Sequence, residues 1–577
     1  MSKQSNQNND INDFKIAILA SFTFSSIKEA LTKKCKKINI SPQFYFGKYN
    51  QYTQEILDRG GGLYNFNPSL IIIFIDIKTL LGDLFFQPYQ ISNDKRKIWA
   101  QKTIDNLRGL IKMVLADTSA KVIFHNFEVP AYSPLGILEN KQEFGFIESI
   151  ELINENLKNT FKSDNRVFIF NYNEFCSRIG KENIVDPKMY YLGDIKLAVN
   201  HLPALCHEYL SYIKPMCSLS KKCIVLDLDN TLWGGIIGED GLEGIKLGPT
   251  PGGRSFLEFQ KHLLSLQQKG ILLAINSKNN PDDVAKVFQE HPYMILRKEH
   301  FVSIKINWVD KVKNMKEIAK ELNIGMDSFV FIDDDKVNRA MISEFLPEIQ
   351  TIELPKDPAL YPETLLKIND FNTIQLTEED KQRGEMYIKE RKREEISLSF
   401  QDLGEFIKSL NLKIAVLEAN KFTIPRISQL TQKTNQFNTS AKRYSEEQIA
   451  EFADSDKCLI KCFKVEDKFG DYGITGVVII KIEDKNWYID TFLLSCRVLG
   501  KNIEFAIMAY IIKIAKEYGI KKIRAKITLT KKNKPVENFY SDCQFEKEVE
   551  CRQDGSKVYI FDTVSDNYIN SDYININ

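Results

Sequence analysis

The sequence has no excess of charge of either sign and no long apolar run. Lysine and arginine total 78 and aspartate and glutamate total 77 in 577 residues. A protein that coats nucleic acid needs a basic excess, so this balance argues against that class. The longest apolar run, residues 70–77, is interrupted by Asp76 and is far too short to span a bilayer.

Paired cysteines and a signal peptide are also lacking. The ten cysteines include no Cys-x-x-Cys pair, so neither a disulfide framework nor a thiolate metal site is indicated. The first ten residues, MSKQSNQNND, are polar and lack the apolar core of a signal peptide. We therefore expect a soluble protein of a reducing cytoplasm. The last third of the chain has no histidine to assist thiol chemistry.

The length suggests about three or four domains of roughly 150 residues each. Residues 1–12 are polar and are expected to be disordered. A first domain is predicted over residues 13–214, with strands at 14–20, 70–77, 121–125 and 166–170 and a helix at 97–115. Strands that alternate with helical patterns predict a parallel α/β sheet.

A second α/β domain is predicted over residues 215–375. We expect strands at 223–228, 271–275 and 328–332, and helices at 254–269, 282–289 and 310–322. This alternation is typical of a doubly wound sheet with helices on both faces.

A charged, helix-favouring connector is predicted over residues 376–395, before a third domain at 396–563. The expected elements are antiparallel strands at 412–417, 459–465, 473–482 and 487–494, a helix at 502–518 and a strand at 522–527. This mixture predicts an α+β domain. The tail, residues 564–577, is expected to be loose.

The most informative segment, VLDLDNTLWGG, begins at Val225 and carries Asp227 and Asp229 at the end of a buried-type strand. In open α/β sheets, ligands bind at that edge. One carboxylate can attack phosphorus, and the other can protonate the leaving oxygen and then activate water. Two carboxylates repel a phosphate, so the reaction needs a hard cation such as Mg²⁺. We predict Asp227 as nucleophile and Asp229 as acid/base.

Supporting groups follow in order on the expected elements. The strand at 271–275 is followed by Asn276 and Ser277, whose hydroxyl can hold a phosphate oxygen. Lys311 begins a helix, and Asp333 and Asp334 end the next strand as further metal ligands. A lone Asp-x-Asp is more often a surface turn, but four such elements in order favour a site.

Residues 221–346 resemble the haloacid dehalogenase (HAD) superfamily. The resemblance implies the roles given above for Asp227 and Asp229, with Mg²⁺ held by Asp227, the backbone carbonyl of Asp229, Asp333 and Asp334. The candidate phosphate-binding residues are Thr231, Asn276, Ser277, Lys278 and Lys311, with Lys305 and Lys313 as alternatives to Lys311.

The spacing leaves little room for an inserted cap domain. Fifty positions separate Asp227 from Ser277, and 34 separate Ser277 from Lys311. The expected helices and strands use most of them. An uncapped site is open to water and to large partners, which favours hydrolysis unless another domain or a carrier protein covers it.

Three further segments are distinctive: QLTQKTNQFN (429–438), DKFGDYGITG (467–476) and LLSCRVLGKNIE (493–504). With LDNTLWGGIIGEDG (228–241), they make the whole chain resemble the FkbH-like family, HAD subfamily IIIC phosphatases and glyceryl transferases. The resemblance implies transfer of a glyceryl unit from 1,3-bisphosphoglycerate to an acyl carrier protein in polyketide or other secondary metabolism. Asp335, Lys336 and Asn338 stand where relatives read Asn, Pro and Glu; we expect little effect.

The third domain resembles GNAT-type N-acyltransferases, in which an Arg-x-x-Gly-x-Gly/Ala loop and a helix N-terminus hold a pyrophosphate. Arg497 and Gly500 match this loop, but Asn502 replaces the final small residue, which weakens the case for acetyl-CoA. A phosphopantetheine arm is an alternative occupant of that groove. Cys496, beside Arg497 and near the helix start, is a candidate acyl-thioester nucleophile. The alternative is a small buried strand cysteine.

The first domain resembles a degenerate SGNH hydrolase. Ser21 and Asn126 follow strands and suit a nucleophile and an oxyanion donor. A serine esterase also needs a histidine base, yet residues 186–190 read Asp-Pro-Lys-Met-Tyr, and His201 is a poorly placed substitute. We favour a scaffold or carrier-docking role for this domain.

The resemblances and patterns together predict a multidomain α/β protein. It has an SGNH- or flavodoxin-like parallel sheet, a HAD-like doubly wound domain without a large cap, and an α+β GNAT-like domain. The leading interpretation is a phosphatase coupled to glyceryl transfer onto a carrier thiol. The alternatives are a stand-alone magnesium-dependent phosphatase of a small phosphorylated metabolite, and outer domains that serve only as a carrier-binding platform.

Overall fold

The computed structural model describes residues 12–375, 384, 386, 387, 389, 393, 400, 402–530, 533–547, 556–565 and 574–577. The predicted disordered N-terminus up to residue 11 and most of the predicted connector at 376–395 lie outside the described residues. The chain divides into two compact units, Met1–Met216 and Cys217–Asn577. Within the described part, no helix has the length and apolar composition that crossing a membrane requires.

The first unit contains a five-stranded sheet whose strands are all parallel. Its order is β2 (Ile40–Phe46), β1 (Asn12–Ala20), β3 (Leu70–Phe74), β4 (Lys121–His125) and β5 (Val167–Phe170). The strand β3, LIIIF, is buried along its whole length, as expected for a strand covered on both faces. This confirms the predicted parallel α/β fold.

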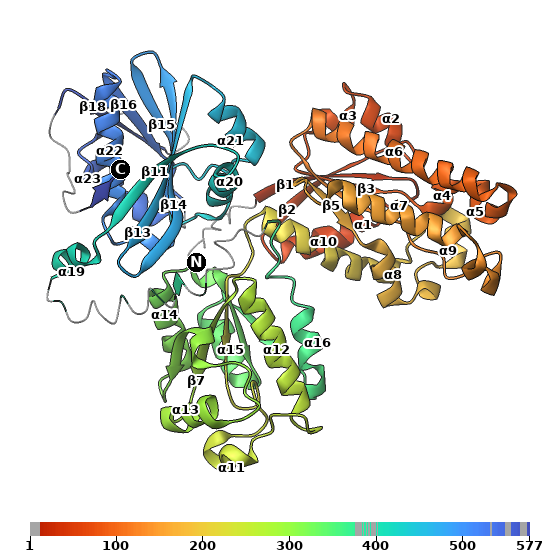
Figure 1. Ribbon diagram of the computed structural model, residues 1–577, viewed down its shortest axis with the longest axis horizontal. Coiled ribbons are helices and arrows are strands. Elements are labelled where there is room, and N and C mark those ends of the chain that lie inside the picture. The colour runs from red at the N-terminus through yellow and green to blue at the C-terminus, as the bar shows by residue number, and fades with distance from the viewer. Residues whose placement is uncertain are drawn as a thin grey trace, which may run out of the picture. The chain divides into compact units, whose positions relative to one another are not determined.

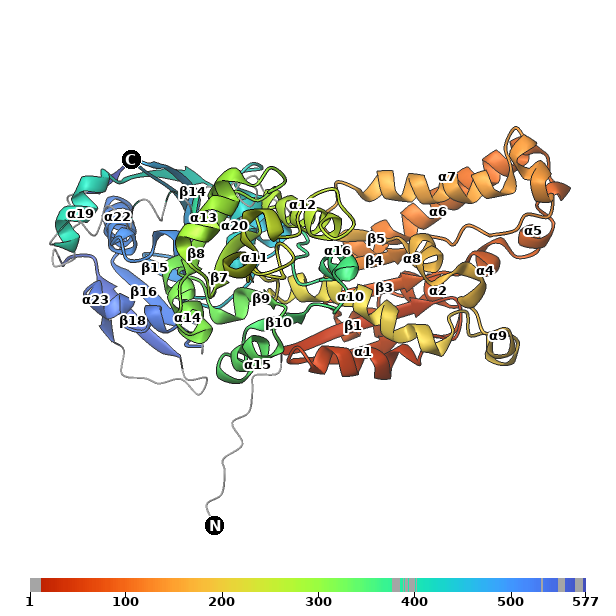
Figure 2. The ribbon, with the colours of Figure 1, turned by 90° about the horizontal axis from the view of Figure 1, so that it is seen from below.

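Helices cover both faces of this sheet. They are α1 (Ile27–Lys36), α2 (Tyr52–Leu57), α3 (Gly62–Phe66), α4 (Ile77–Leu81), α5 (Asp83–Phe86), α6 (Asn93–Asp117), α7 (Phe146–Phe161), α8 (Tyr172–Ile179), α9 (Pro187–Gly193) and α10 (Leu202–Met216). Figure 2 shows α6 and α7 on one face and α1 on the other. The strand predicted at 70–77 ends at Phe74 because Asp76 caps α4, accepting from the Thr79 N–H at 2.9 Å.

The second unit begins with another parallel sheet. Its order is β10 (Gln350–Glu353), β9 (Phe329–Asp333), β6 (Cys223–Leu226), β7 (Leu272–Ser277) and β8 (Phe301–Ile306). The helices are α11 (Ile237–Gly244), α12 (Arg254–Gln268), α13 (Pro281–Glu290), α14 (Lys311–Leu322), α15 (Lys336–Phe345) and α16 (Tyr361–Leu366). Ile224 of β6 packs in a core with α12 and α13, whereas its neighbour Val225 packs with α14 and α15. The sheet is therefore doubly wound, as predicted.

No cap domain interrupts this fold near the predicted site. Residues 227–311, all of which are described, contain α11, α12, β7, α13, a short 3-10 turn and β8. The sequence did not predict α11, the 3-10 turn or β8; α11 has eight residues and β8 has six, too few for a cap domain. The site described below therefore lies at a sheet edge that is open within this domain.

The third sheet is mixed. Its order is β17 (Glu546–Lys547), β18 (Lys557–Asp562), β16 (Lys522–Ile527), β15 (Asn486–Leu494), β14 (Gly470–Glu483), β13 (Cys458–Asp467), β11 (Lys413–Glu418) and β19 (Asn575–Ile576). The predicted antiparallel strands are antiparallel, but β15 and β16 are parallel, joined by the crossover helix α22 (Ile503–Glu517). This strand order and the single crossover give the α+β, GNAT-like fold.

The helices of this domain lie on both faces of the sheet. They are α19 (Leu403–Leu410), α20 (Ile424–Lys433), α21 (Glu446–Ala453), α22 and α23 (Phe539–Asp542). Figure 1 shows α22 on one side of the sheet and α20 and α21 on the other. The chain end, predicted to be loose, differs from that prediction: β19 pairs with β11, and the Asn577 N–H donates to the Ile414 carbonyl at 2.9 Å.

A short strand, β12 (Phe437–Asn438), fills the space where β15 and β16 diverge. Phe437 pairs with Leu494 of β15. The next residue but one, Thr439, donates its N–H to the Phe492 carbonyl at 3.0 Å and accepts from the Thr528 N–H, just after β16, at 2.9 Å. The chain's own segment 437–439 therefore occupies the gap between these two strands.

Asp490 of β15 is a buried carboxylate with several partners. It accepts from Lys442 Nζ at 2.6 Å and from the Tyr444 hydroxyl at 2.5 Å, and Lys481 Nζ lies 3.2 Å away. Burial alone would raise the pKa of Asp490, but these hydrogen bonds and charges outweigh burial and lower it below its ordinary value. The ionised carboxylate therefore stabilises the third domain.

We expect Asp490→Asn to lower stability by about 2 kcal/mol at pH 7, since hydrogen bonds to a buried charge are lost. Because the folded-state pKa is depressed, this contribution is present above the unfolded pKa of about 3.9 and is lost as the pH falls through the folded pKa. Urea midpoints of both proteins between pH 7 and pH 3 should therefore converge at low pH. The matched control is Asp471→Asn in the exposed pair with Lys464, with an expected loss below about 1 kcal/mol. A gap that widens on acidification would contradict this account.

Candidate active site

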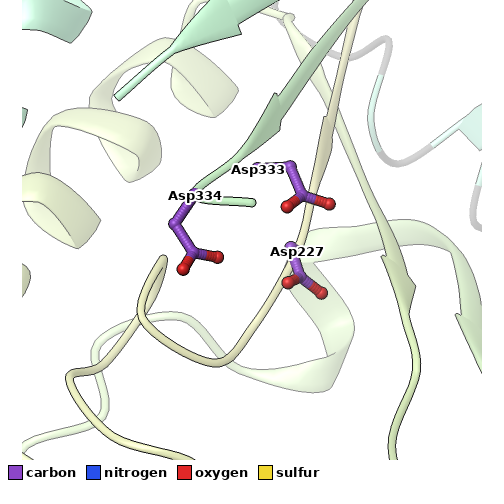
Figure 3. Close-up of side chains that lie close together, drawn as sticks. All are labelled: Asp227, Asp333 and Asp334. Atoms are coloured by element: carbon purple, nitrogen blue, oxygen red, sulfur yellow. The ribbon is translucent and has the colours of Figure 1, made fainter. Parts of the chain in front are cut away.

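Three aspartates meet at the carboxyl edge of the second sheet. Asp227 follows β6, and Asp333 and Asp334 stand at the end of the neighbouring strand β9. The Asp227 N–H donates to the Ile332 carbonyl at 3.0 Å, which holds the two strand ends together. One carboxylate oxygen from each aspartate lies within 4.8 Å of the others, and Figure 3 shows the three side chains grouped around a common space.

Lys311 supplies the positive charge of this group. Its Nζ lies 3.0 Å from Asp227 Oδ1 and 2.6 Å from Asp333 Oδ2, and the side chain is buried. Burial would lower the pKa of Lys311, but the charges of Asp227 and Asp333 outweigh burial and raise it. Lys311 is therefore held as a cation beside the predicted nucleophile. The alternatives do not reach this position: Lys305 pairs with Glu321 at 3.2 Å, and Lys313 is exposed.

The Asn276 side chain, predicted to contact phosphate, is bonded to α14. Its Nδ2 donates to the Lys311 carbonyl at 2.9 Å, and its Oδ1 accepts from Asn314 Nδ2 at 3.0 Å. Because it is fully buried and both its polar atoms are used, it ties the start of α14 to β7. The side chain therefore positions Lys311, and its contact with phosphate stays a prediction.

The Asp229 carboxylate is held by donors from three places in the chain. Its Oδ1 accepts from Trp233 Nε1 at 2.8 Å and from the Ile237 N–H at 3.1 Å, and its Oδ2 accepts from Asn279 Nδ2 at 2.9 Å. These bonds fix the orientation of the side chain beside Asp227. The carboxylate is not part of the three-aspartate group, so only its backbone carbonyl is left for the predicted metal contact.

Sequence reasoning missed Asn279. This buried amide also lies 3.3 Å from Ser277 Oγ, so it joins the predicted acid/base to the predicted phosphate-binding hydroxyl. The only signal in the sequence is its place two residues after Ser277 in the loop Asn-Ser-Lys-Asn. Lys278, predicted as a phosphate contact, is exposed at the same loop.

Thr231 is the other predicted phosphate contact. The residue is fully buried, and within the described residues its hydroxyl oxygen has no hydrogen-bond partner. A buried polar group without a partner is costly, and a ligand oxygen would satisfy it. This observation agrees with a bound phosphate or metal-bound water at this edge of the sheet.

Asp335 and Asn338, which differ from the residues of relatives, lie beside the metal-ligand candidates without disturbing their backbone. The Asp335 N–H donates to Asp333 Oδ1 at 2.8 Å, and its carboxylate caps α15 through the Val337 N–H at 2.8 Å. Arg339 donates to the carbonyls of Asp333 and Asp334, both at 2.7 Å. The two metal-ligand candidates therefore keep a fixed backbone.

The donor set fits Mg²⁺. Magnesium prefers hard oxygen ligands, and three carboxylates converge here with one compensating lysine. Burial, together with the charges of Asp227 and Asp333, raises the pKa of Asp334 to about 6. A divalent cation would remove this repulsion, with Asp227, Asp333 and Asp334 as the side chains that would hold it.

The candidate residues of the third domain are not part of the three-aspartate group. Cys496 is half-buried and begins a 3-10 turn seven positions before α22 starts at Ile503. Its Sγ lies 3.7 Å from the Tyr387 hydroxyl. Arg497 donates to Ser495 Oγ at 3.2 Å, and Gly500 has the left-handed φ of 77° that favours glycine. Since β12 fills the gap between β15 and β16, the phosphopantetheine arm predicted for this groove would have to displace it.

The first domain brings no base to Ser21. Its Oγ accepts from the Asp76 N–H at 2.9 Å, and no histidine bonds to it in the part of the chain that the structure describes. Asn126 bonds to Asn171 and Asn173 at 3.0 and 3.1 Å, and His201 Nε2 lies 2.9 Å from the Asn183 carbonyl. This geometry favours the scaffold role over an active esterase.

A solved structure is similar to more than half of this chain. The N-terminal part of the protein BF1531 from Bacteroides fragilis, described as containing a phosphatase domain and complexed with Mg, is 29% identical to this chain. The match has a TM-score of 0.58 and covers 63% of this chain and 95% of that one. The fold and the aspartate–lysine site thus define a HAD-type phosphatase domain.

The first domain matches a known family model. Residues 15–214 match the model described as FkbH, N-terminal domain. The chain is therefore similar to FkbH in its first domain, and a HAD-type sheet and a mixed GNAT-like sheet follow this domain. No curated protein matches the sequence.

Solved acetyltransferases also match the third domain. The ribosomal-protein-S18-alanine N-acetyltransferase from Escherichia coli is 11% identical, with a TM-score of 0.21, and covers 27% of this chain and 99% of its own. The GNAT domain of S. lividans PAT is 14% identical, with a TM-score of 0.22, and covers 26% and 89%.

Proposed function

We propose that this protein is a magnesium-dependent phosphatase that acts through an aspartyl phosphate on Asp227. The observation that carries the proposal is the group of Asp227, Asp333 and Asp334, with Lys311 Nζ 3.0 Å from the proposed nucleophile. The likeness to a phosphatase domain that was crystallised with Mg supports it.

The proposed reaction consists of two successive displacements at phosphorus. An Asp227 oxygen attacks phosphorus, the bond from phosphorus to the leaving oxygen breaks, and Asp229 donates the proton that the leaving oxygen needs. In the second step Asp229 takes a proton from water, which attacks the same phosphorus and releases phosphate from Asp227. When bound, Mg²⁺ neutralises the phosphate charge that the carboxylates would otherwise repel.

The chain's own groups prepare Asp229 for the second step. Both its oxygens already accept hydrogen bonds, from Trp233, Ile237 and Asn279, which is the arrangement of an ionised base. To act as an acid, Asp229 must first carry a proton on one of these oxygens. That oxygen must then lose one of its hydrogen-bond donors. Asn279 is the donor nearest to the phosphate side, because it also contacts Ser277.

We further propose the substrate and acceptor implied by the family. The phosphate ester would be a phosphoglyceryl unit derived from 1,3-bisphosphoglycerate, and the product would be a glyceryl thioester on an acyl carrier protein. Cys496 is the proposed thiol that receives the acyl group first. The FkbH N-terminal match supports this assignment, and the open site leaves room for a carrier-borne substrate.

A second candidate is a stand-alone phosphatase of a small phosphorylated metabolite. Two observations favour it: β12 fills the gap between β15 and β16, and Cys496 contacts a tyrosine hydroxyl, with no histidine available in the last third of the chain. In this case the outer domains would serve only as a binding platform.

One incubation separates the two candidates. Purified protein is mixed with 1,3-bisphosphoglycerate, Mg²⁺ and a phosphopantetheinylated carrier, and released phosphate and carrier mass are measured. We expect phosphate release that EDTA stops and added Mg²⁺ restores, and a carrier mass increased by one glyceryl unit. An unchanged carrier mass with phosphate still released would favour the second candidate. Release that persists in EDTA would reject the magnesium site.

A further inference from the structure

Four exposed apolar side chains lie on the segments that follow the strands of the aspartate site. Trp308 is 75% exposed, Val337 64%, Ile236 39% and Val309 37%. Ile236 follows β6, Trp308 and Val309 follow β8, and Val337 lies in the first turn of α15 after β9, all on the carboxyl side of the sheet that carries Asp227. Single exposed apolar residues are ordinary, but several on the rim of one site mark a binding surface.

The segments after β6 and β8 are each fixed to a site residue by a hydrogen bond. The residue after Ile236 donates its N–H to Asp229 at 3.1 Å. Asn307, before Trp308, donates its N–H to the Ser277 carbonyl at 3.2 Å. The rim therefore keeps its position relative to the site.

The turn that carries Trp308 is rigid. Asn307 Oδ1 accepts from the Val309 N–H and from Asn314 Nδ2, both at 3.0 Å, and Asp310 caps α14 through the Val312 N–H at 2.8 Å. Lys311 follows three residues after Trp308, and three residues span at most about 11 Å. The backbone of Trp308 therefore lies between Asn307, which bonds to Ser277, and the start of the helix that carries Lys311.

Trp308 has no packing role among the described residues. Of the four tryptophans, Trp233 and Trp487 are buried, and Trp99 is half-buried against the first domain's core. Trp308 joins no hydrophobic core cluster among the described residues. A large aromatic side chain on a fixed turn loses little entropy when it contacts a ligand.

We propose that Trp308 is a specificity-determining residue that packs against the organic body of the substrate beyond its phosphate. The substrate class is a phosphate ester with an extended, partly apolar body, such as a phosphoacyl group on a pantetheine-type arm. A small phosphorylated acid would end before it reached the rim. The proposal rests on the proposed phosphatase function and names the part of the substrate that the site selects.

The test compares two esters with the same phosphate group: 3-phosphoglycerate and the 3-phosphoglyceryl thioester of pantetheine. We expect Trp308→Ala to raise KM for the thioester at least fivefold, with kcat unchanged, and to leave 3-phosphoglycerate unaffected. Trp308→Phe should restore most of the difference. The matched control is Phe345→Ala, which removes another exposed aromatic ring (61%) at the far end of α15, about 13 Å along the helix from its start.

Binding to the Asp227→Asn variant, with and without Trp308→Ala, gives a readout that does not depend on turnover. If Trp308→Ala weakens binding of the thioester but not of 3-phosphoglycerate, the proposal is supported. Failure of the wild-type enzyme to release phosphate would reject the phosphatase function, and the binding result would still stand. Equal effects on both esters, or none, would overturn the proposal. The proposal would also be overturned if the wild-type protein were a dimer, and Trp308→Ala made it a monomer with unchanged kinetics. Trp308 would then lie in a contact between two copies of the chain.

Discussion

Asp227→Asn is expected to abolish phosphate release, with a loss on the order of 10⁴-fold or more, as for other removed nucleophiles. An amide does not attack phosphorus, so no aspartyl phosphate forms. The substitution keeps the shape of the side chain, and Lys311 retains Asp333 at 2.6 Å as its partner. The loss should therefore be one of chemistry and not of folding.

Phosphate release, the trapped acyl phosphate and the urea midpoint are the measurements for this variant. Asp335→Asn makes the same chemical change two positions after Asp333, at an exposed residue that caps α15. Asparagine also caps helices, so this control should keep activity within about threefold. Substantial activity in a folded Asp227→Asn protein would refute the assignment of the nucleophile.

Lys311→Met is expected to have the second-largest effect. It removes the cation that lies 3.0 Å from Asp227 and 2.6 Å from Asp333, so transition-state charge on the phosphoryl group loses a fixed partner. Losing one such group costs on the order of 10²–10³-fold in kcat. It also leaves two buried carboxylates without a counter-charge, and breaking a buried ion pair in this way costs about 3–5 kcal/mol.

Magnesium separates these two consequences. Because the cation would bind the same carboxylates, added Mg²⁺ should recover part of the stability of Lys311→Met, measured as a higher urea midpoint, without recovering kcat. The control Lys313→Met changes an exposed lysine on the same helix and should alter neither quantity. A Lys311→Met variant with normal kcat would show that this lysine is only structural.

The strand pattern accounts for most of the predicted fold. The strand predicted at 121–125 is β4 to the residue, and those at 271–275 and 328–332 differ from β7 and β9 by one or two residues at their ends. The edge strands β2, β8 and β10 were missed, because a strand at a sheet edge carries polar residues and lacks a continuous apolar run.

The third domain shows where local pattern is insufficient. Nothing in Gln-Phe-Asn predicts that Phe437 and Asn438 form a strand, because their partners in β15 are more than 50 positions away in the sequence. The tail was expected to be loose for the same reason: Asn575 and Ile576 become a strand only where β11 offers a free edge.

The sequence by itself determined that Asp227, Ser277 and Asp333 stand at strand ends, because a buried apolar run followed by a polar residue marks the edge of a parallel sheet. It also determined that no cap interrupts this site. Only the tertiary structure decided that Asn276 holds Lys311 and that Asn279 holds Asp229, since strand register and side-chain direction choose between residues three positions apart. It likewise left Trp308 exposed at the rim of the site, where the packing of the rest of the domain does not cover it.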